Sequence, residues 1–586
     1  MGAHDAQPRN RLRIIALLLS AVLGIVGFRL VEFQVVLADD INEISDAKRE
    51  VQRTIESQRG SIVDANGEVL ARTIYRYDIN VAPNMVGPVF RDVEGVRIEL
   101  TVGEIAQELA LILDMDVNEV FQALSGEGNY ANLKKRVNAS VFQQVETLDI
   151  PWIFVDEISY RLYPSGAVAG NLVGFVDVDG YPLAGLERQY NTCLAGVDGQ
   201  ETFERSAQGM KIPSSAQTIK PPVEGGDLQL TIDSDLQYFT QQVLADAVQS
   251  QNAEYAVGVV IEVETGRLLV AAEAPSVDPN DPSLIPSEHR QSKIFQNSYE
   301  PGSVMKAITT SIAVDTQNAN AYTQIIAEDS MSLPWGDTID DSFDHDPRKL
   351  TPAGILTISS NVGITKLAGE IDRNIRYDYL LDFGFGDQSA INFEGESSGL
   401  LRPADEWDGM TNLTTLFGQG LAVTPIQMAY SYQALANDGV YLDPVLVESC
   451  TRDGESTMQP NQQSTRVLDQ STARVTVDMM EKVVERGGVG KTAQVPGYRV
   501  AGKTGTAQIQ ADDGSGYGDE FAISFIGMAP AEDPKYVVSV MVYKPEGATN
   551  SAGATPPFKS IMSQVLRHYR VPPSTTPSAN IPTEWE

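Results

Sequence analysis

Cysteine and histidine are scarce in this sequence, which holds two cysteines and four histidines among 586 residues. Their spacing matches no zinc-binding pattern, so the sequence gives no reason to expect a metal site. We therefore expect no metal site, and we expect no organic cofactor either.

The two cysteines, Cys193 and Cys450, lie far apart along the chain and in different predicted domains. An exported protein can keep a disulfide, but the sequence does not show whether two distant cysteines can meet in space. The interpretation that we favour is two unpaired cysteines, and a disulfide is the alternative.

Basic residues are also few. The chain has 43 Lys and Arg and 79 Asp and Glu, which give a formal net charge of −36. This balance disfavours nucleic acid as a partner, since a nucleic-acid site needs a basic patch. The length of the chain predicts more than one domain and leaves room for a sizeable core.

One apolar run near the N-terminus, residues 14–28, holds no charged residue and follows three arginines. An apolar run of this length after basic residues predicts a transmembrane anchor over residues 12–37, with residues 1–11 in the cytoplasm and the rest exported. The alternative is a signal peptide cleaved near Ala38. Arg29 and Glu32 can pair on one face of this helix, and such a pair could contact a partner within the membrane.

A serine and a lysine three residues apart, Ser303 and Lys306, open a predicted helix after the turn at Pro301 and Gly302. Side chains at this spacing share a helix face, and the helix N-terminus favours an alkoxide. A buried lysine loses its charge readily, so Lys306 could take the serine proton. The alternative is an ordinary helix cap beside a surface lysine.

A second polar motif, Ser359 and Asn361, follows an amphipathic stretch. Ser359 could relay a proton between Lys306 and a leaving amine. Asn361 could bond the lysine and a substrate amide together. The alternative is an ordinary polar loop.

A third motif, Lys503 to Thr506, continues a predicted strand. Alternation places Thr504 and Thr506 on one side, where their hydroxyl groups could bind a carboxylate, and Lys503 on the other. Gly505 would let a substrate backbone approach closely. The backbone N–H groups of Ser303 and Thr506 could form an oxyanion hole. The alternative is a solvated strand end.

Together these S-x-x-K, S-x-N and K-T-G motifs resemble those of penicillin-binding proteins and class A β-lactamases. Further segments resemble class B penicillin-binding proteins, which are monofunctional D,D-transpeptidases, and residues 359–363 look most like the septal, FtsI-type branch. These segments are the G-Q-G of residues 418–420, the T-P-x-Q of residues 424–427, the opening around Arg59, Gly60, Asp64 and Gly67, and a second block with Arg161, Tyr163 and Glu187.

Two sequence blocks of related protein classes are not found here, and each absence argues against one of those classes. The sequence shows no E-x-x-L-N run, which in class A β-lactamases holds the deacylating glutamate, so a penicilloyl enzyme would hydrolyse slowly. It shows no convincing glycosyltransferase block, which argues against the bifunctional class A proteins.

The resemblance implies an α+β fold. We expect a five-stranded antiparallel sheet with helices on both faces and a helical subdomain, over residues 223–570. An extended non-catalytic pedestal or dimerisation domain is expected over residues 38–222. The tail, residues 571–586, is rich in Pro, Ser and Thr and is predicted to be disordered.

The resemblance also implies a function, which is cross-linking of peptidoglycan stem peptides through an acyl group on Ser303. Lys306 would act as the base, and Ser359 and Asn361 would assist it. Lys503 would supply a positive charge. The substrate would be bound by Thr504, Gly505 and Thr506. β-Lactams would acylate Ser303. Expected partners are a SEDS-type membrane glycosyltransferase and divisome membrane proteins. The alternatives are a D,D-carboxypeptidase or slow β-lactamase, and a β-lactam sensor or scaffold on the same fold.

Overall fold

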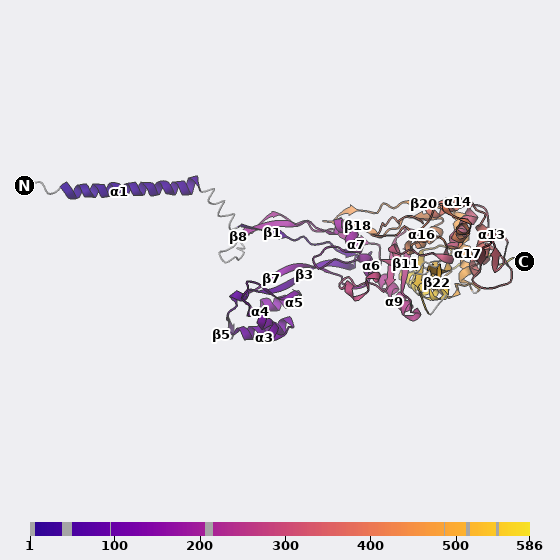
Figure 1. The fold of residues 1–586 in the computed structure, drawn as a ribbon, viewed down its shortest axis with the longest axis horizontal. Helices are drawn as coiled ribbons and strands as arrows, with labels where there is room; N and C mark the ends of the chain where they lie inside the picture. The colour runs from indigo at the N-terminus through magenta and orange to yellow at the C-terminus, as the bar shows by residue number, and fades with distance from the viewer. Residues whose placement is uncertain are drawn as a thin grey trace, which may run out of the picture. The chain divides into compact units, whose positions relative to one another are not determined.

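A computed structural model describes residues 6–37, 50–93, 95–204, 215–485, 487–510, 516–546 and 550–586 (Figure 1). The chain forms two compact units. The first comprises residues 1–58 and 196–225, and the second comprises residues 59–195 and 226–586.

The first unit contains an apolar helix, α1 (Ala6–Val31), which continues into a π-helical turn, η1 (Glu32–Val36). Residues 10–36 are long and apolar enough to cross a membrane, with a mean hydropathy of 2.5 in the most apolar window. Arg29 Nη1 lies 2.8 Å from Glu32 Oε2, as the spacing predicts. The unit also holds a three-stranded antiparallel sheet in the order β1 (Glu50–Ile55), β8 (Gly199–Glu204) and β9 (Gln217–Lys220).

A seven-stranded sheet organises the N-terminal part of the second unit. Its order is β19 (Glu455–Met458), β18 (Val447–Arg452), β10 (Asp227–Leu230), β2 (Ile62–Val63), β3 (Val69–Val81) and β6 (Ala131–Val137), and β7 (Ile153–Leu162) also pairs with β3. Three helices gather beside β3 and β6, namely α3 (Val102–Leu113), α4 (Val117–Leu124) and α5 (Ala139–Glu146) (Figure 1). A hairpin of β4 (Val89–Val93) and β5 (Val96–Leu100) precedes them.

A buried carboxylate ties distant segments of this region together. Glu187 lies in α7 (Gly185–Gln189), and its side chain is fully buried between two arginines. Arg59 Nε donates to Glu187 Oε2 over 2.6 Å, and Arg161 Nε donates to Glu187 Oε1 over 2.7 Å. A carboxylate without these partners would carry a large desolvation cost, so all three residues are needed together.

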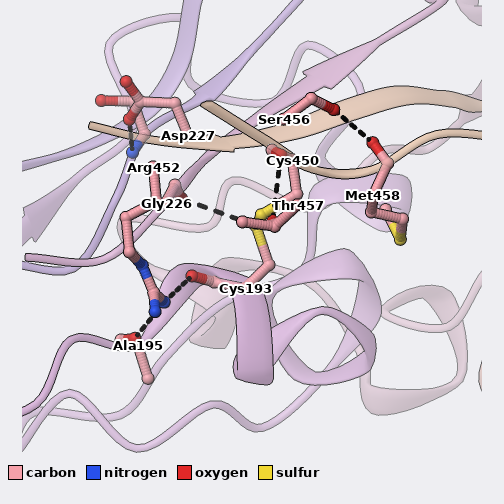
Figure 2. The surroundings of a disulfide bond; sticks show 10 residues. Cys193, Ala195, Gly226, Asp227, Cys450, Arg452, Ser456, Thr457 and Met458 are labelled. Atoms are coloured by element: carbon pink, nitrogen blue, oxygen red, sulfur yellow. Dashed lines mark hydrogen bonds between the residues drawn. A yellow bond between two sulfur atoms is a disulfide. The ribbon is translucent and has the colours of Figure 1, made fainter. Parts of the chain in front are cut away.

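Cys193 and Cys450 form a disulfide, so the prediction of two unpaired cysteines is wrong (Figure 2). Cys193 lies in α8 (Asn191–Leu194), and Cys450 lies in β18, with Cα atoms 6.2 Å apart. The Arg452 guanidinium donates to the carbonyl oxygens of Cys193 and Ala195, and Gly226 N–H also donates to Cys193 O. The sequence separates the cysteines by 257 residues, but β10 contacts α8 and pairs with β18, and this brings the two segments together.

The C-terminal part is built on the predicted five-stranded antiparallel sheet, which confirms the fold class. Its order is β12 (Leu268–Ala274), β11 (Tyr255–Glu262), β23 (Tyr536–Tyr543), β22 (Tyr517–Ala529) and β21 (Ala501–Gln510). Helices α9 (Ser234–Gln251) and α18 (Thr555–His568) cover one face, and α16 (Pro425–Ala436) and α17 (Gln470–Val484) cover the other. Strands β11 and β23 are therefore buried along nearly their whole length.

The helical subdomain lies between β12 and β21 in sequence. Its helices are α10 (Lys293–Gln296), α11 (Met305–Asp315), α12 (Pro352–Ile358), α13 (Asn361–Ala368), α14 (Arg373–Asp382) and α15 (Gly409–Thr414). Small antiparallel pairs join β13 (Ile325–Ala327) to β16 (Arg348–Leu350), β14 (Ser330–Ser332) to β15 (Thr338–Asp340), and β17 (Val440–Leu442) to β20 (Ser464–Arg466).

The C-terminal tail packs against this subdomain, so the prediction of disorder from its composition is wrong. Thr351 N–H donates to Thr583 O over 3.1 Å, and Thr351 Oγ1 donates to Pro582 O over 2.5 Å. Ile581 is 8% exposed, and the indole N–H of Trp585 donates to Ile325 O. The tail gains order because its backbone pairs beside β16 and its few large side chains find contacts.

Gly354 is the residue that lets the tail approach α12. A Cβ atom at this position would lie 1.9 Å from Thr583 O, so Gly354→Ala should displace the tail and destabilise the fold by about 1–3 kcal/mol. Thermal unfolding and amide exchange of residues 580–585 measure the effect. Gly87→Ala is the matched control, because nothing lies within 4 Å of its Cβ position. An unchanged exchange rate in Gly354→Ala would contradict the prediction.

Candidate active site

The three sequence motifs meet at one pocket of about 930 Å³ on the second unit. The first motif comes from the turn before α11, the second from the junction of α12 and α13, and the third from the edge strand β21. Ser303, Ser359, Asn361, Thr504 and Thr506 all line the pocket. The tertiary structure thus brings together segments that are far apart in sequence.

Ser303 is held in a 3₁₀ turn, η6 (Gly302–Val304), that leads into α11. Gly302 has φ +60°, and its N–H donates to Gly418 O over 2.9 Å. A Cβ on Gly418, which has φ +83°, would lie 2.2 Å from Gly302 O. The glycine of the G-Q-G segment therefore lets two backbones pack closely and fixes the serine turn.

Lys306 is fully buried, and its Nζ lies 2.8 Å from Ser303 Oγ. Nζ also donates to Ser359 O over 2.7 Å and lies 3.3 Å from Ser359 Oγ. Burial lowers the pKa of Lys306 to about 7, although the negative charge of Asp341 acts in the opposite direction. A neutral amine at this position can accept the serine proton near neutral pH.

Ser359 ends α12 in the left-handed conformation, with φ +63°. This sharp bend lets its hydroxyl group lie between two amines, 3.3 Å from Lys306 Nζ and 2.9 Å from Lys503 Nζ. Ser360 has a different task, because its Oγ accepts Gly363 N–H at 2.8 Å and caps α13. The adjacent serines thus separate chemistry from helix capping, a distinction that the sequence analysis did not make.

Asn361 is not placed as the sequence analysis expected. Its side-chain amide donates to Asp340 O over 2.8 Å, and the Ser359 carbonyl group takes the expected place of Asn361 beside Lys306. The prediction that Asn361 fixes the lysine is therefore wrong in this structure. Asn361 still lines the pocket, where its side chain can meet a substrate.

Lys503 is also fully buried, with Nζ 2.9 Å from Ser359 Oγ, 3.0 Å from Thr504 O and 3.1 Å from Thr504 Oγ1. Burial, and then the charge of Lys306, lower the pKa of Lys503 well below its usual range. Two ammonium groups around one hydroxyl group repel, so the pair favours a state with a single positive charge.

Gly505 serves a purpose other than the one expected. A Cβ at this position would lie 2.3 Å from Ser524 Oγ, 3.0 Å from Val304 Cγ1 and 3.2 Å from Pro301 O. The missing side chain therefore makes room for the serine turn beneath β21, whereas the sequence analysis assigned the space to a substrate. Thr504 and Thr506 both line the pocket, and their role in binding a carboxylate stays a prediction.

Sequence reasoning missed a carboxylate beside the second motif. Asp341 Oδ1 accepts the backbone N–H groups of Asn361 at 2.5 Å and Val362 at 2.9 Å. No motif marked Asp341, because its loop is twenty residues away in sequence and meets α13 only in the folded chain. Among the residues that the structure describes, no group of three or more His, Cys, Asp or Glu side chains is arranged to hold a metal ion.

The fold and this arrangement, a serine hydroxyl group beside a buried lysine, are those expected of a serine acyl-transfer protein. Residues 256–563 match the penicillin-binding protein transpeptidase domain, and residues 54–230 match the penicillin-binding protein dimerisation domain. The chain belongs to the class B penicillin-binding proteins of the FtsI type, which confirms the resemblance inferred from the motifs.

Curated relatives match over nearly the whole chain. The penicillin-binding protein PbpB of Mycolicibacterium smegmatis is 33% identical over 97% of this chain and 91% of its own length. The peptidoglycan D,D-transpeptidase FtsI of Escherichia coli is 30% identical over 95% of this chain and 91% of its own.

Solved structures match as well. A peptidoglycan synthetase from Bifidobacterium adolescentis has a TM-score of 0.72 and 30% identity, covering 92% of this chain and 100% of that chain. Penicillin-binding protein 3 from Mycobacterium tuberculosis, complexed with aztreonam, has a TM-score of 0.70 and 28% identity, covering 91% of this chain and 100% of that chain.

Proposed function

We propose that this protein is a membrane-anchored peptidoglycan D,D-transpeptidase that cross-links stem peptides during septal wall synthesis. The observation that carries the proposal is the 2.8 Å contact between Lys306 Nζ and Ser303 Oγ at the floor of a pocket walled by Thr504 and Thr506. The names of the E. coli and M. smegmatis relatives support the reaction and the binding of penicillin.

In the acylation step, Ser303 Oγ attacks the carbonyl carbon between the two terminal D-alanines of a donor stem, while its proton passes to neutral Lys306. The backbone N–H groups of Ser303 and Thr506 stabilise the oxyanion. The C–N bond then breaks, and a proton returns through Ser359 to the departing D-alanine. The hydroxyl groups of Thr504 and Thr506 hold the terminal carboxylate, with the positive charge of the lysine pair behind them.

In the second step, the amine of another stem attacks the Ser303 ester. It loses a proton to the same lysine, forms the new amide and releases the serine. β-Lactams enter the first step as amides with a strained ring, and the resulting ester blocks Ser303. Complexes of the M. tuberculosis relative with aztreonam and ampicillin support β-lactam binding.

Membrane anchoring by residues 10–36 would hold the pocket on the outer side of the cytoplasmic membrane. We further propose a SEDS-type membrane glycosyltransferase and divisome membrane proteins as partners. The Arg29–Glu32 pair supports a contact inside the bilayer, because a charged pair there is costly unless another protein surrounds it.

Product analysis distinguishes this function from the two alternatives. Membranes that contain the full chain and its glycosyltransferase, supplied with pentapeptide precursor, should yield cross-linked dimeric muropeptides on mass spectrometry. Trimmed monomers alone would identify a carboxypeptidase, and a stable penicilloyl adduct without any peptide product would identify a sensor. Membranes treated with penicillin provide the control, and they should lose the dimers.

A further inference from the structure

A buried carboxylate–imidazole pair stands behind the second motif, outside the groups that the mechanism uses. Asp341 follows β15, and its side chain is 1% exposed. While Asp341 Oδ1 accepts the first two N–H groups of α13, Asp341 Oδ2 lies 3.0 Å from His345 Nε2. One carboxylate thus joins the start of α13 to a histidine.

The surroundings of His345 determine its charge. His345 Nδ1 lies 2.8 Å from the Asp346 carbonyl oxygen, and His345 Nε2 faces the Asp341 carboxylate. Both partners are acceptors, so both ring nitrogens must donate, and only the imidazolium ion has two N–H groups. Burial works to lower the pKa of His345, but the hydrogen bonds to Asp346 and Asp341 outweigh it and raise the pKa.

Among the described residues, few other charges act on this pair and on Lys306. Arg348, from β16, works against protonation of His345. Lys503, from β21, shares the Ser359 hydroxyl group with Lys306. The Asp340 side chain is engaged by Ser330 and Thr338 in the β14–β15 hairpin. Among the carboxylates that the structure describes, Asp341 is the one whose negative charge raises the pKa of Lys306.

We propose that Asp341 and His345 form a positioning pair that holds the Ser359–Asn361 segment in place and sets how easily Lys306 gives up its proton. This inference rests on the proposed role of Lys306 as the base. The positioning effect acts through the N–H groups of Asn361 and Val362, which are two and three residues after Ser359, whose carbonyl oxygen contacts Lys306. The electrostatic effect on Lys306 comes from the negative charge of Asp341, which the positive charge of the His345 imidazolium offsets.

The two members of the pair should act on Lys306 with opposite signs. An uncompensated Asp341 carboxylate stabilises the ammonium form, so loss of the imidazolium should raise the pH needed for a neutral base. Loss of the carboxylate should lower that pH. A residue with a merely structural role would change the size of the rate and leave its pH dependence in place.

The experiment is the pH profile of the second-order rate of acylation by penicillin, measured on the full-length protein. In the unmodified protein the rate should rise with pH through a midpoint near 7, the pKa of Lys306. His345→Gln keeps an N–H donor without the charge, and its midpoint should move up by about 1 pH unit. Asp341→Asn keeps an oxygen acceptor for α13, and its midpoint should move down by a similar amount.

Controls separate the possible failures. The double variant Asp341→Asn/His345→Gln should return close to the original midpoint, and Asp344→Asn, an exposed carboxylate in the same loop, should leave it unchanged. Rates are normalised to the fraction of protein that forms the adduct at saturation, so partial unfolding does not mimic a shift. Midpoints that stay fixed, or that move in the same direction in both single variants, overturn this inference. An unmodified protein that forms no adduct on Ser303 overturns the proposed function instead.

Discussion

Ser303→Ala is expected to form no covalent adduct with penicillin and to produce no cross-linked muropeptides. The variant loses the single oxygen that attacks penicillin and the donor stem peptide, so the acylation rate should fall by about 10⁴-fold or more. The turn that carries the residue is held by backbone contacts between Gly302 and Gly418, which the substitution leaves intact. Thermal stability should therefore stay close to that of the unmodified protein.

Intact-protein mass spectrometry after penicillin treatment, followed by peptide mapping, measures this effect. Ser342→Ala is the matched control, because Ser342 lines the same pocket on another loop and should label normally. An adduct that persists in Ser303→Ala, or that maps to another residue in the unmodified protein, would place the nucleophile elsewhere.

Lys306→Met is expected to separate activity from stability. Without an amine within 2.8 Å, the Ser303 hydroxyl group keeps its proton, so acylation should slow by about 10²–10⁴-fold. The fold should be as stable as before or more stable, since an apolar side chain of similar length replaces a fully buried amine.

The stability effect has a defined dependence on pH. Because the pKa of Lys306 in the folded state, about 7, lies below its unfolded value, the unfolded chain binds more protons. The free energy of unfolding therefore decreases as the pH falls from about 10 towards 7, because Lys306 takes up its proton in the unfolded chain before it does so in the folded chain. The stabilisation in Lys306→Met should be largest at or below pH 7.

Thermal unfolding at pH 7 and pH 9 tests this together with the acylation rate. Lys559→Met, at an exposed position on α18, is the control and should change neither measurement greatly. A variant that is inactive only because it is unfolded would contradict the prediction, and so would one that acylates at the original rate.

The sequence identified the chemistry of the site because each motif is local. A serine three residues before a lysine shares its helix face, and here Ser303 Oγ and Lys306 Nζ are 2.8 Å apart. The family resemblance likewise predicted the five strands of the main sheet, and its inner strands are continuous apolar runs because both faces of the sheet are covered. The apolar residues near the N-terminus specified a helix of membrane-spanning length without any tertiary contact.

Contacts between distant segments were beyond the reach of such patterns. The Cys193–Cys450 disulfide, the tail docked beside Thr351, and the space that Gly505 leaves for Val304 all depend on which segments meet after folding. Asn361 and Asp341 show the same limit. Motif spacing predicted that the Asn361 amide bonds Lys306, whereas in the folded chain this amide donates to Asp340 O. Packing also brings the Asp341 carboxylate, which belongs to no motif, to the start of α13. Local sequence thus determined which groups we propose as reactive, and the tertiary structure decided what holds them and how their charges are balanced, because burial and long-range pairing exist only in the folded chain.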